Sequence, residues 1–468
     1  MKNHKIELQE ELSLKKKFDV VVVGAGTGGC MAAKTVADAG FEVCLIDRKR
    51  RESVGDKVCG DAIGKHHFDN LGLSYPVGEE LEREMVGVKI YSPDVETVFN
   101  AEGEGLYGFM INRYLFGQRL LEIATDAGAT FIESTQASKP IIKDHFVSGV
   151  LAKNLKTRRE VTLSSQVVVE ASGLSAALRT KLPPEIGIDT TIHKEDIIIC
   201  YREIRKLKEQ ISDPNFCEIY LNLQFAPGGY SWVFPESETK VNVGLGVVAS
   251  DDSPNPKKQL YSYILSKKLF KESSVVTGGG GQVPTRRPLD CMTGNGITIV
   301  GDAACQVNPI HGGGMGPSMT GGAMAGKAIV EAMSNDDVSQ RGLWSYNVNY
   351  MQSYGAKQAG LDVFRLFLQG LSDDDLNYGM KYRIITEKDL LKASMGEDIH
   401  VNLTEKTIRV LRGVRKLSLL KKLGETASLM KTMREHYRNY PTSPKGFGEW
   451  KKKTQQLVQG AVKMRVAS

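Results

Sequence analysis

The feature that most constrains this chain is a glycine-rich turn set between an apolar run and a small-residue segment. Residues 18–23 (FDVVVV) are largely apolar and β-branched, which predicts a buried parallel strand. The turn GAGTGG at 24–29 follows at once, and residues 30–39 contain no helix breaker, which predicts a helix. A second apolar run, residues 41–46, ends at the acidic Asp47. Together these segments predict one βαβ unit of about 30 residues.

The spacing of the glycines and of the acidic residue fits a dinucleotide site. Gly24 permits a tight turn, Gly26 lets the backbone approach a pyrophosphate, and Gly29 allows the helix to pack closely on the strand. The N–H groups and the dipole at the helix N-terminus favour a phosphate anion. Asp47 is placed to accept from a ribose hydroxyl, which favours a 2′-hydroxyl over a 2′-phosphate. The alternative is a tight turn in an unrelated α/β protein.

A second glycine-rich turn indicates which dinucleotide binds. Residues 297–300 predict another buried strand, and Gly301-Asp302 begins the turn after it. The segment NPIHGGGMG at 308–316 then leads into a Gly/Ala-rich helix. A glycine run at a helix N-terminus can lie against a flat ring and stabilise the negative charge of a reduced flavin. A nicotinamide enzyme needs no such second site, so the sequence predicts FAD.

The remaining patterns predict an α/β fold with a discontinuous dinucleotide domain. The length, 468 residues, exceeds what one core supports. Residues 195–284 contain short β-like runs separated by Pro and Gly, typical of an antiparallel sheet. We therefore expect a Rossmann-like FAD-binding domain with an inserted antiparallel β-sheet substrate domain and a C-terminal helical region. The expected boundaries are 1–180 and 285–340 for the FAD-binding domain, 181–284 for the β-rich domain, and 341–468 for the helical, basic region.

Composition and charge limit which cellular location and which partners can be expected for the chain. Hydrophobic residues are 41% and charged residues 25%, ordinary values for a globular protein. No apolar run approaches the ~20 residues of a membrane span, and the N-terminus lacks the apolar core of a secretory signal, so a cytoplasmic location is expected. From Thr404 to Ser468, sixteen Lys/Arg stand against four Asp/Glu. This basic end suits peripheral contact with an anionic membrane, and a solvated helical face is the alternative.

The seven cysteines show neither C-x-x-C nor zinc-ligand spacing, so we expect reduced thiols and no bound metal. No nucleic-acid partner is expected either.

Four motifs together resemble the geranylgeranyl reductase family, within the p-hydroxybenzoate-hydroxylase-like flavoproteins. Two of them, GAGTGG with Asp47 and Gly301-Asp302 with Pro309, are shared with many flavin monooxygenases. The segment GDKVCGDA at 55–62 lies along the flavin in that family. The segment PGGYSWVFP at 227–235, followed by GLG at 244–246, fits the Y-x-W-x-F-P…G-x-G signature of its substrate-binding sheet and is the most specific. The resemblance covers nearly the full length and is strongest with archaeal enzymes that saturate the isoprenoid chains of ether lipids.

The resemblance implies a set of cofactor-binding residues. They are Gly24, Gly26, Gly28, Gly29, Asp47, Cys59, Gly60, Ala62, Arg113, Ala137, Asp302, Gly314 and Met315. Arg113 begins an amphipathic helix expected over 113–127, where the wider family often places a flavin-contacting Arg or Gln, and Arg119 competes for that role. Ala137 falls where a strand passes the adenine. No residue is assigned a catalytic step.

Substrate contact is expected from Tyr230 and Trp232, which lie two residues apart and therefore share one face of a strand. Two aromatics on one face suit a long apolar polyene, and sheet core is the alternative. Cys59 could be a redox-sensitive group beside the flavin or a small buried hydrophobe. His311 could donate a proton or make a structural hydrogen bond. Gly278 to Gly281 lack a strand–helix context and are expected to form a loop.

The implied function is saturation of C=C bonds in the geranylgeranyl chains of archaeal-type ether phospholipids, with hydride from N5 of reduced FAD. The implied partners are this lipid and an electron donor, either reduced ferredoxin or NAD(P)H, since no second strand–G-x-G-x-x-G–helix unit exists. Two other functions stay open. One is a flavin monooxygenase or halogenase of the same fold, and the other is a lipid-binding FAD protein without turnover.

Overall fold

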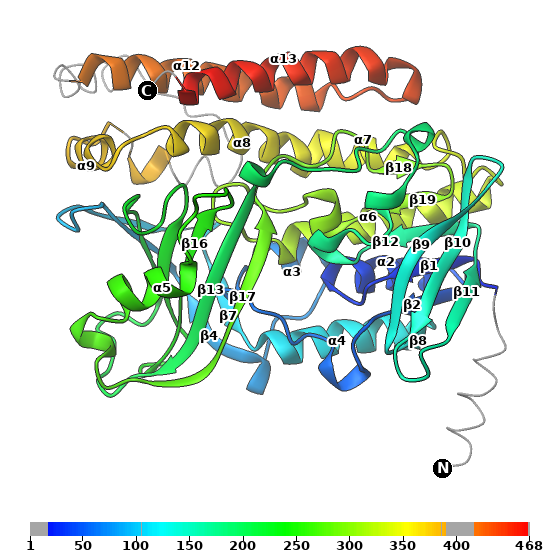
Figure 1. The fold of residues 1–468 in the computed structure, drawn as a ribbon, viewed down its shortest axis with the longest axis horizontal. Helices are drawn as coiled ribbons and strands as arrows, with labels where there is room; N and C mark the ends of the chain where they lie inside the picture. The colour runs from blue at the N-terminus through cyan, green and yellow to red at the C-terminus, as the bar shows by residue number, and fades with distance from the viewer. Residues whose placement is uncertain (1–16, 104, 385, 390–415, 467–468) are drawn as a thin grey trace.

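Two sheet-based units lie beneath a layer of helices in the computed structural model, which describes residues 17–103, 105–384, 386–389 and 416–466 (Figure 1). The first unit contains a six-stranded sheet in the order β18-β19-β12-β1-β2-β8. Neighbouring strands are parallel except for the edge pair β18–β19. The strands are β1 (Val20–Val23), β2 (Val43–Ile46), β8 (Thr130–Ile132), β12 (Val167–Glu170), β18 (Thr293–Gly294) and β19 (Ile297–Ile299).

Burial on both faces explains why the central strands of this sheet are continuous apolar runs. Every residue of β1, β2 and β12 is buried, as is typical of a parallel sheet covered by helices. Helices α2 (Thr27–Asp38) and α6 (Met315–Ser334) pack so closely that a Cβ on Gly322 would lie 2.1 Å from the carbonyl oxygen of Gly28. The expected βαβ unit and the strand before Gly301 are confirmed.

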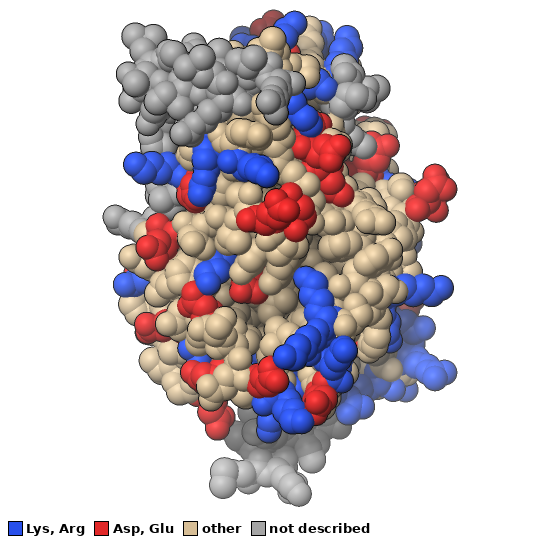
Figure 2. Space-filling view, turned by 90° about the vertical axis from the view of Figure 1, so that its left-hand side faces the viewer, with Lys and Arg blue, Asp and Glu red and all other residues tan. Residues whose placement is uncertain are grey.

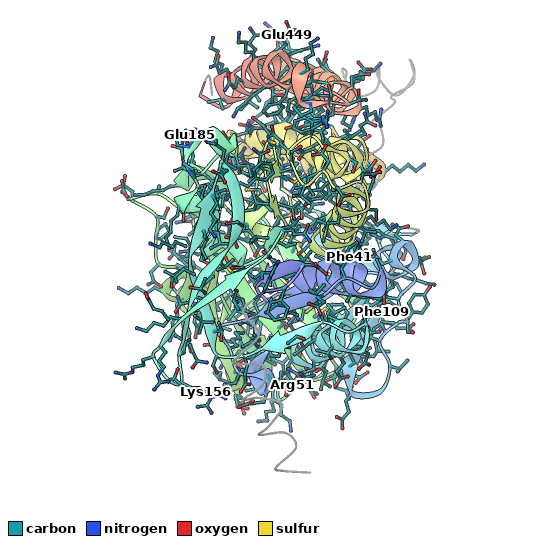
Figure 3. The ribbon with its side chains drawn as sticks, turned by 90° about the vertical axis from the view of Figure 1, so that its right-hand side faces the viewer. Phe41, Arg51, Phe109, Lys156, Glu185 and Glu449 are labelled. Atoms are coloured by element: carbon teal, nitrogen blue, oxygen red, sulfur yellow. The ribbon has the colours of Figure 1, made fainter. Side chains whose placement is uncertain are left out.

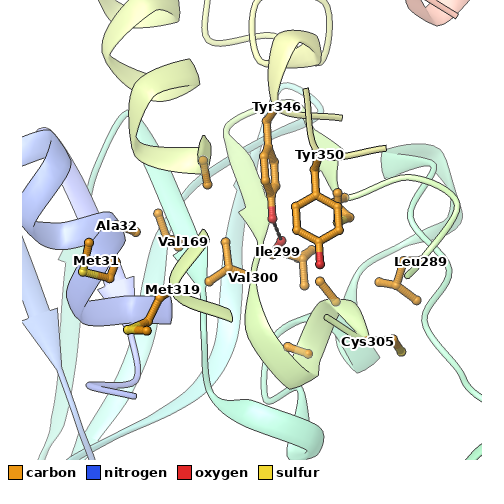
Figure 4. Packing of buried hydrophobic residues seen from close by; sticks show 14 of the residues in the cluster. Met31, Ala32, Val169, Leu289, Ile299, Val300, Cys305, Met319, Tyr346 and Tyr350 are labelled. Atoms are coloured by element: carbon orange, nitrogen blue, oxygen red, sulfur yellow. Dashed lines mark hydrogen bonds between the residues drawn. The ribbon is translucent and has the colours of Figure 1, made fainter. Parts of the chain in front are cut away.

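Figure 4 shows the core where α2, α6 and α7 (Trp344–Tyr350) meet the parallel sheet. Met31 of α2 and Met319 of α6 lie among the strand residues. Tyr346 is fully buried, and its hydroxyl donates a hydrogen bond to the carbonyl of Ile299 at 2.9 Å. A buried hydroxyl needs such a partner, so this bond joins the helical layer to the sheet.

The second unit is a seven-stranded sheet in the order β17-β13-β16-β15-β14-β5-β6, antiparallel except for the pair β14–β5. The expected antiparallel sheet is therefore confirmed. Two of its strands, β5 and β6, come from residues ahead of the segment expected to supply it, so the division into domains given above stays a proposal. The strands are β5 (Gly87–Tyr91), β6 (Val98–Glu102), β13 (Ile197–Lys206), β14 (Phe216–Tyr220), β15 (Tyr230–Pro235), β16 (Lys240–Val248) and β17 (Ser274–Pro284).

The expectation of a loop at Gly278 to Gly281 is wrong. These glycines lie inside β17 and pair with Glu203 to Cys200 of β13. A run of four glycines has little strand propensity, but the cross-strand hydrogen bonds to β13 impose the extended conformation. Glycine is needed because the backbone of β17 lies close to Val58. A Cβ on Gly279 would lie 2.7 Å from the Val58 side chain.

Two small sheets and two helices complete the lower part of the molecule. The sheets have the orders β3-β7-β4 and β11-β10-β9. Their strands are β3 (Ala62–Gly64), β4 (Leu81–Met85), β7 (Gly108–Ile111), β9 (Thr135–Lys143), β10 (Phe146–Asn154) and β11 (Glu160–Ser164). The helices are α3 (His66–Leu71) and α4 (Arg113–Asp126), and the second confirms the helix expected over 113–127. A short helix, α5 (Pro256–Gln259), follows β16.

The C-terminal part is helical, as expected, and α12 and α13 form an outer layer on α8 (Figure 1). Its helices after α7 are α8 (Ala356–Gln369), α9 (Asp373–Lys381), α12 (Leu417–Arg438) and α13 (Phe447–Val466). Residues 390–415 of the expected helical region lie outside the described residues. Figure 3 shows Glu449 of α13 at one end of the molecule and Arg51 and Lys156 at the other.

Charges of both signs are interspersed over the face shown in Figure 2. Within the described ranges, none of the helices is long and apolar enough to cross a membrane.

Candidate dinucleotide and substrate site

The first glycine turn has the geometry that the sequence predicts for a phosphate-binding loop. Gly24 has a φ of +107°, and a Cβ there would lie 2.4 Å from the carbonyl of Ala171. A Cβ on Gly29 would lie 1.9 Å from the carbonyl of Gly24, so helix and strand meet backbone to backbone. A Cβ on Gly26 would point into open space, and Gly26 caps α2 without a side chain. The N-terminus of α2 is therefore open at Gly26, and an anion can approach the N–H groups of its first turn there.

Asp47 is held by the same turn. Its carboxylate accepts hydrogen bonds from the backbone N–H of Ala25 and of Lys49, both at 2.8 Å. The carbonyl of Asp47 in turn accepts from the N–H of Thr135 at 2.7 Å, which brings the start of β9 to the turn. Ala137 is buried two residues further along β9. The start of the strand that carries Ala137 therefore lies against Asp47, and the adenine contact of Ala137 stays a prediction.

The second glycine turn lies against the 55–62 segment. The carboxylate of Asp302 lies 3.0 Å from the ammonium nitrogen of Lys57. A Cβ on Gly314 would lie 3.3 Å from the same carboxylate, and Met315 begins α6 beside it. Gly301 needs its positive φ of +67° for this turn. Asp302, Gly314 and Met315 are thus brought together with the 55–62 segment at the N-terminus of a 20-residue helix.

The 55–62 segment is fixed to the substrate sheet through the backbone of Cys59. The carbonyl of Cys59 accepts hydrogen bonds from Arg202 Nε at 3.1 Å and from Asn242 Nδ2 at 2.9 Å. A Cβ on Gly60 would lie 3.3 Å from the ring of Phe234. Burial raises the pKa of the Cys59 thiol, which disfavours the reactive thiolate.

Arg113 and Arg119, the two competitors for a flavin contact, have different surroundings. Arg113 is buried at the start of α4, and its Nε and Nη1 atoms have no hydrogen-bond partner among the residues that the structure describes. Arg119 donates to the carboxylate of Glu80 and to the carbonyl of Ser74, at 2.8 and 2.9 Å. Unpaired buried guanidinium nitrogens indicate a missing acceptor. The residues present therefore fit a bound FAD. Arg113 has two such unpaired nitrogens and Arg119 has one, its Nε, among the described residues.

The aromatic side chains of β15 form a row on one face. The Trp232 ring lies 6.0 Å from Tyr230 and 6.1 Å from Phe234, measured between centroids. A Cβ on Gly244 of β16 would lie 2.2 Å from the Trp232 ring. The motif therefore pairs a tryptophan on one strand with a glycine on the next, which explains the spacing of its two halves.

Two polar contacts fix this aromatic row. The indole Nε1 of Trp232 donates to Asn242 Oδ1 at 3.0 Å, and the hydroxyl of Tyr230 donates to the carbonyl of His311 at 2.7 Å. Asn242 also donates to the carboxylate of Asp61 at 2.8 Å. Sequence reasoning missed Asn242 and Asp61. A polar residue inside the apolar run of β16 was the available signal for Asn242, since buried amides in strands need specific partners.

Burial raises the pKa of Asp61 to about 7, and the carboxylate charge of Glu236 adds to that shift. Arg202 acts against it, with its Nη2 atom 3.8 Å from the Asp61 carboxylate. Asp61 is 4% exposed and has a φ of +61°. A buried carboxyl that titrates near neutral pH thus lies between the cofactor segment and the substrate sheet.

Comparison with known proteins agrees with this geometry. Residues 196–283 match the family model of the geranylgeranyl reductase catalytic domain, and residues 19–176 match that of glucose inhibited division protein A. A digeranylgeranylglycerophospholipid reductase of Sulfolobus acidocaldarius is 44% identical over 94% of this chain and 97% of its own. A protein of that name from Methanothrix thermoacetophila is 34% identical over 77% of this chain and 90% of its own.

Solved structures share the fold. A geranylgeranyl bacteriochlorophyll reductase-like protein of Thermoplasma acidophilum superposes with a TM-score of 0.74 at 23% identity, over 88% of this chain and 100% of that one. A flavin-dependent brominase superposes with a TM-score of 0.62 at 18% identity, over 86% and 100%. The parallel sheet with its two glycine turns, joined to a large antiparallel sheet, defines a flavoprotein of the FAD-dependent class. Within that class, the chain belongs to the geranylgeranyl reductase family.

Proposed function

We propose that this protein is an FAD-dependent reductase that saturates C=C bonds in the geranylgeranyl chains of archaeal ether phospholipids. The observation that carries the proposal is 44% identity, along nearly the whole chain, to a digeranylgeranylglycerophospholipid reductase. The aromatic row of β15 supports it, because it adjoins the 55–62 segment through Phe234 and Gly60. An apolar polyene suits a surface of this kind.

FAD would be held by three regions of the chain. The turn at Gly24–Gly29 and the N-terminus of α2 would take the pyrophosphate, and Asp47 would take a ribose hydroxyl. Arg113 would supply the buried donors that now lack an acceptor. When bound, FAD supplies hydride transfer. The remaining cofactor-binding residues expected from the sequence are also proposed to contact FAD.

The residues of the chain itself would orient the substrate and exclude water. Tyr230 and Trp232 would offer one face to the polyene, since their hydroxyl and indole N–H are bonded to His311 and Asn242. The polar ends of both rings are thereby satisfied inside the protein. Only the apolar parts of the rings then need to face the chain of the lipid.

The test is anaerobic incubation of the dithionite-reduced holoprotein with digeranylgeranylglyceryl phospholipid, followed by mass spectrometry of the lipid. The expected result is the gain of two hydrogen atoms per saturated bond. In a parallel incubation with air, rapid oxygen consumption by the reduced protein without saturation would indicate the monooxygenase or halogenase alternative. Lipid binding with no mass gain under any donor would contradict reductase activity. Replacing dithionite with reduced ferredoxin or with NAD(P)H identifies the electron donor. Both are proposed as donors.

A further inference from the structure

A cluster of ionisable side chains lies where α3, the loop before α6 and α8 meet, and the mechanism above does not use it. We call it the His–Lys cluster. Its members are His66, His67, His311 and Lys357. They come from three separate parts of the chain, namely α3, the loop before α6, and α8.

The rings are in close contact at the N-terminus of α6. The His66 and His67 rings lie 4.0 Å apart between centroids, and a Cβ on Gly316 would lie 2.2 Å from the His67 ring. His67 is 9% exposed, and Nδ1 of His66 is buried without a hydrogen-bond partner in the described ranges. The His67 ring is 6.3 Å from that of Tyr354.

Lys357 approaches this group from α8. Its ammonium nitrogen lies 5.4 Å from the centroid of Tyr354, and no carboxylate of the described residues pairs with it. The neighbouring Gln358 donates to the carbonyls of Cys305 and Val307, which pins the start of α8 to the loop that carries His311. The start of α8, which carries Lys357, is therefore held beside that loop.

The cluster also touches both halves of the proposed active site. The carbonyl of His311 accepts from Tyr230 on the substrate strand, and Nδ1 of His311 accepts from the N–H of Gly313 at 3.1 Å. Gly314 follows at once, beside Asp302. His311 therefore connects the Tyr230 strand to the loop that carries Gly313 and Gly314.

We propose that the His–Lys cluster, with Lys357 as its proton-holding member, supplies the proton for alkene saturation. This inference rests on the proposed function. Saturation of one C=C bond adds a hydride and a proton while the π bond breaks. The hydride carries two electrons from the reduced flavin and forms one C–H bond. The proton leaves the cluster, forms the other C–H bond, and is replaced from water.

The charge states of the cluster agree with this role. Burial lowers the pKa of Lys357 to about 8, so the ammonium is protonated at neutral pH but releases its proton readily. Burial, followed by the Lys357 charge, lowers the pKa of His311 to about 4 and that of His66. Burial, then His66 and Lys357, lowers the pKa of His67. Other ionisable groups of the described residues that face the cluster include Tyr354 of the preceding turn, Asp69 of α3 and Tyr230 of β15.

The test compares Lys357→Met with Lys357→Arg in single-turnover reduction of the same lipid by reduced holoprotein. Wild type should lose activity as pH rises through about 8, because the ammonium is then deprotonated. Lys357→Met should be slower by roughly 10²-fold and should lack this limb of the profile. Lys357→Arg keeps the charge but cannot release the proton, so it should be equally slow. Wild-type rates in the arginine variant would overturn the proposal.

A second readout needs no turnover. Histidine titration by NMR should show raised pKa values for His66, His67 and His311 in Lys357→Met, because a neighbouring positive charge is gone. Lys267→Met is the matched control, since Lys267 also lies over a tyrosine ring, Tyr220, at 4.3 Å. Unchanged histidine titration would overturn the proposal, and Lys357→Gln replaces the methionine variant if that one does not fold. Inactive wild type, in contrast, would count against the reductase function itself.

Discussion

Arg113 carries two buried nitrogens that lack acceptors in the described ranges, which fits a bound FAD. Arg113→Met should weaken FAD binding by roughly 10- to 100-fold, the loss of a charge-assisted hydrogen bond. Titration of the apoprotein with FAD, followed by flavin fluorescence quenching, measures this. Arg119→Met is the control and should bind FAD as wild type does, because its partner is Glu80. Equal losses in both variants would contradict the assignment.

Asp61 gives the protein a predictable pH dependence. Its folded pKa of about 7 lies above the ordinary value of 3.8, so its stabilising contribution is present below about pH 4 and is lost as pH rises to about 7. Asp61→Asn removes that loss. Relative to wild type, the variant should gain up to about 4 kcal/mol of unfolding free energy between pH 4 and pH 8. Urea unfolding at both pH values tests this. Asp252 is exposed, so Asp252→Asn is the control, and its unfolding free energy should differ from that of wild type by the same amount at both pH values.

Residues of the first turn could be predicted from the sequence because their roles are local. Gly29 and Asp47 act on neighbours within one βαβ unit, and spacing alone reveals such an arrangement. Asn242 and Lys357 could not be found this way. Their partners, Cys59 and His67, are far away in the chain and meet them only after the two sheets and α8 pack.

At the scale of elements, β17 shows where local preference and tertiary structure disagree. Four successive glycines suggested a loop, yet the strand is held by β13 and leaves room for Val58. Gly279→Ala should displace Val58, and with it the adjacent Cys59 and Gly60, because its Cβ would lie 2.7 Å from Val58.

This substitution has a matched control on the next residue. A Cβ on Gly280 would meet only the carbonyl of Cys200, at an ordinary 3.5 Å. FAD content after purification and single-turnover rate should fall in Gly279→Ala and stay near wild type in Gly280→Ala. If both variants retain FAD equally, β17 does not position the 55–62 segment.

At the scale of the whole molecule, the basic C-terminal helices form a layer at one end (Figure 1). Lys445, Lys452 and Lys453 are exposed there. If this layer contacts an anionic membrane, as we propose, changing all three to Gln should weaken binding to phosphatidylglycerol vesicles roughly 10- to 100-fold at low salt. Sedimentation with vesicles measures the effect.

The control for charge alone is a second triple variant. Lys139, Lys143 and Lys153 are exposed on the β9–β10 hairpin, outside the C-terminal helices, and their change to Gln removes the same charge. This variant should bind vesicles as wild type does. Equal binding by wild type and the C-terminal variant would contradict the membrane contact and indicate that these lysines form an ordinary solvated face.

The contact between Gly244 and the Trp232 ring has a consequence for how the family can diverge. With a Cβ excluded at 2.2 Å, position 244 accepts a side chain only if the ring at 232 becomes smaller or moves. The two positions are therefore expected to covary among relatives. A member with a small residue at the tryptophan position would be free to lose the glycine and to carry a bulkier side chain there in its place.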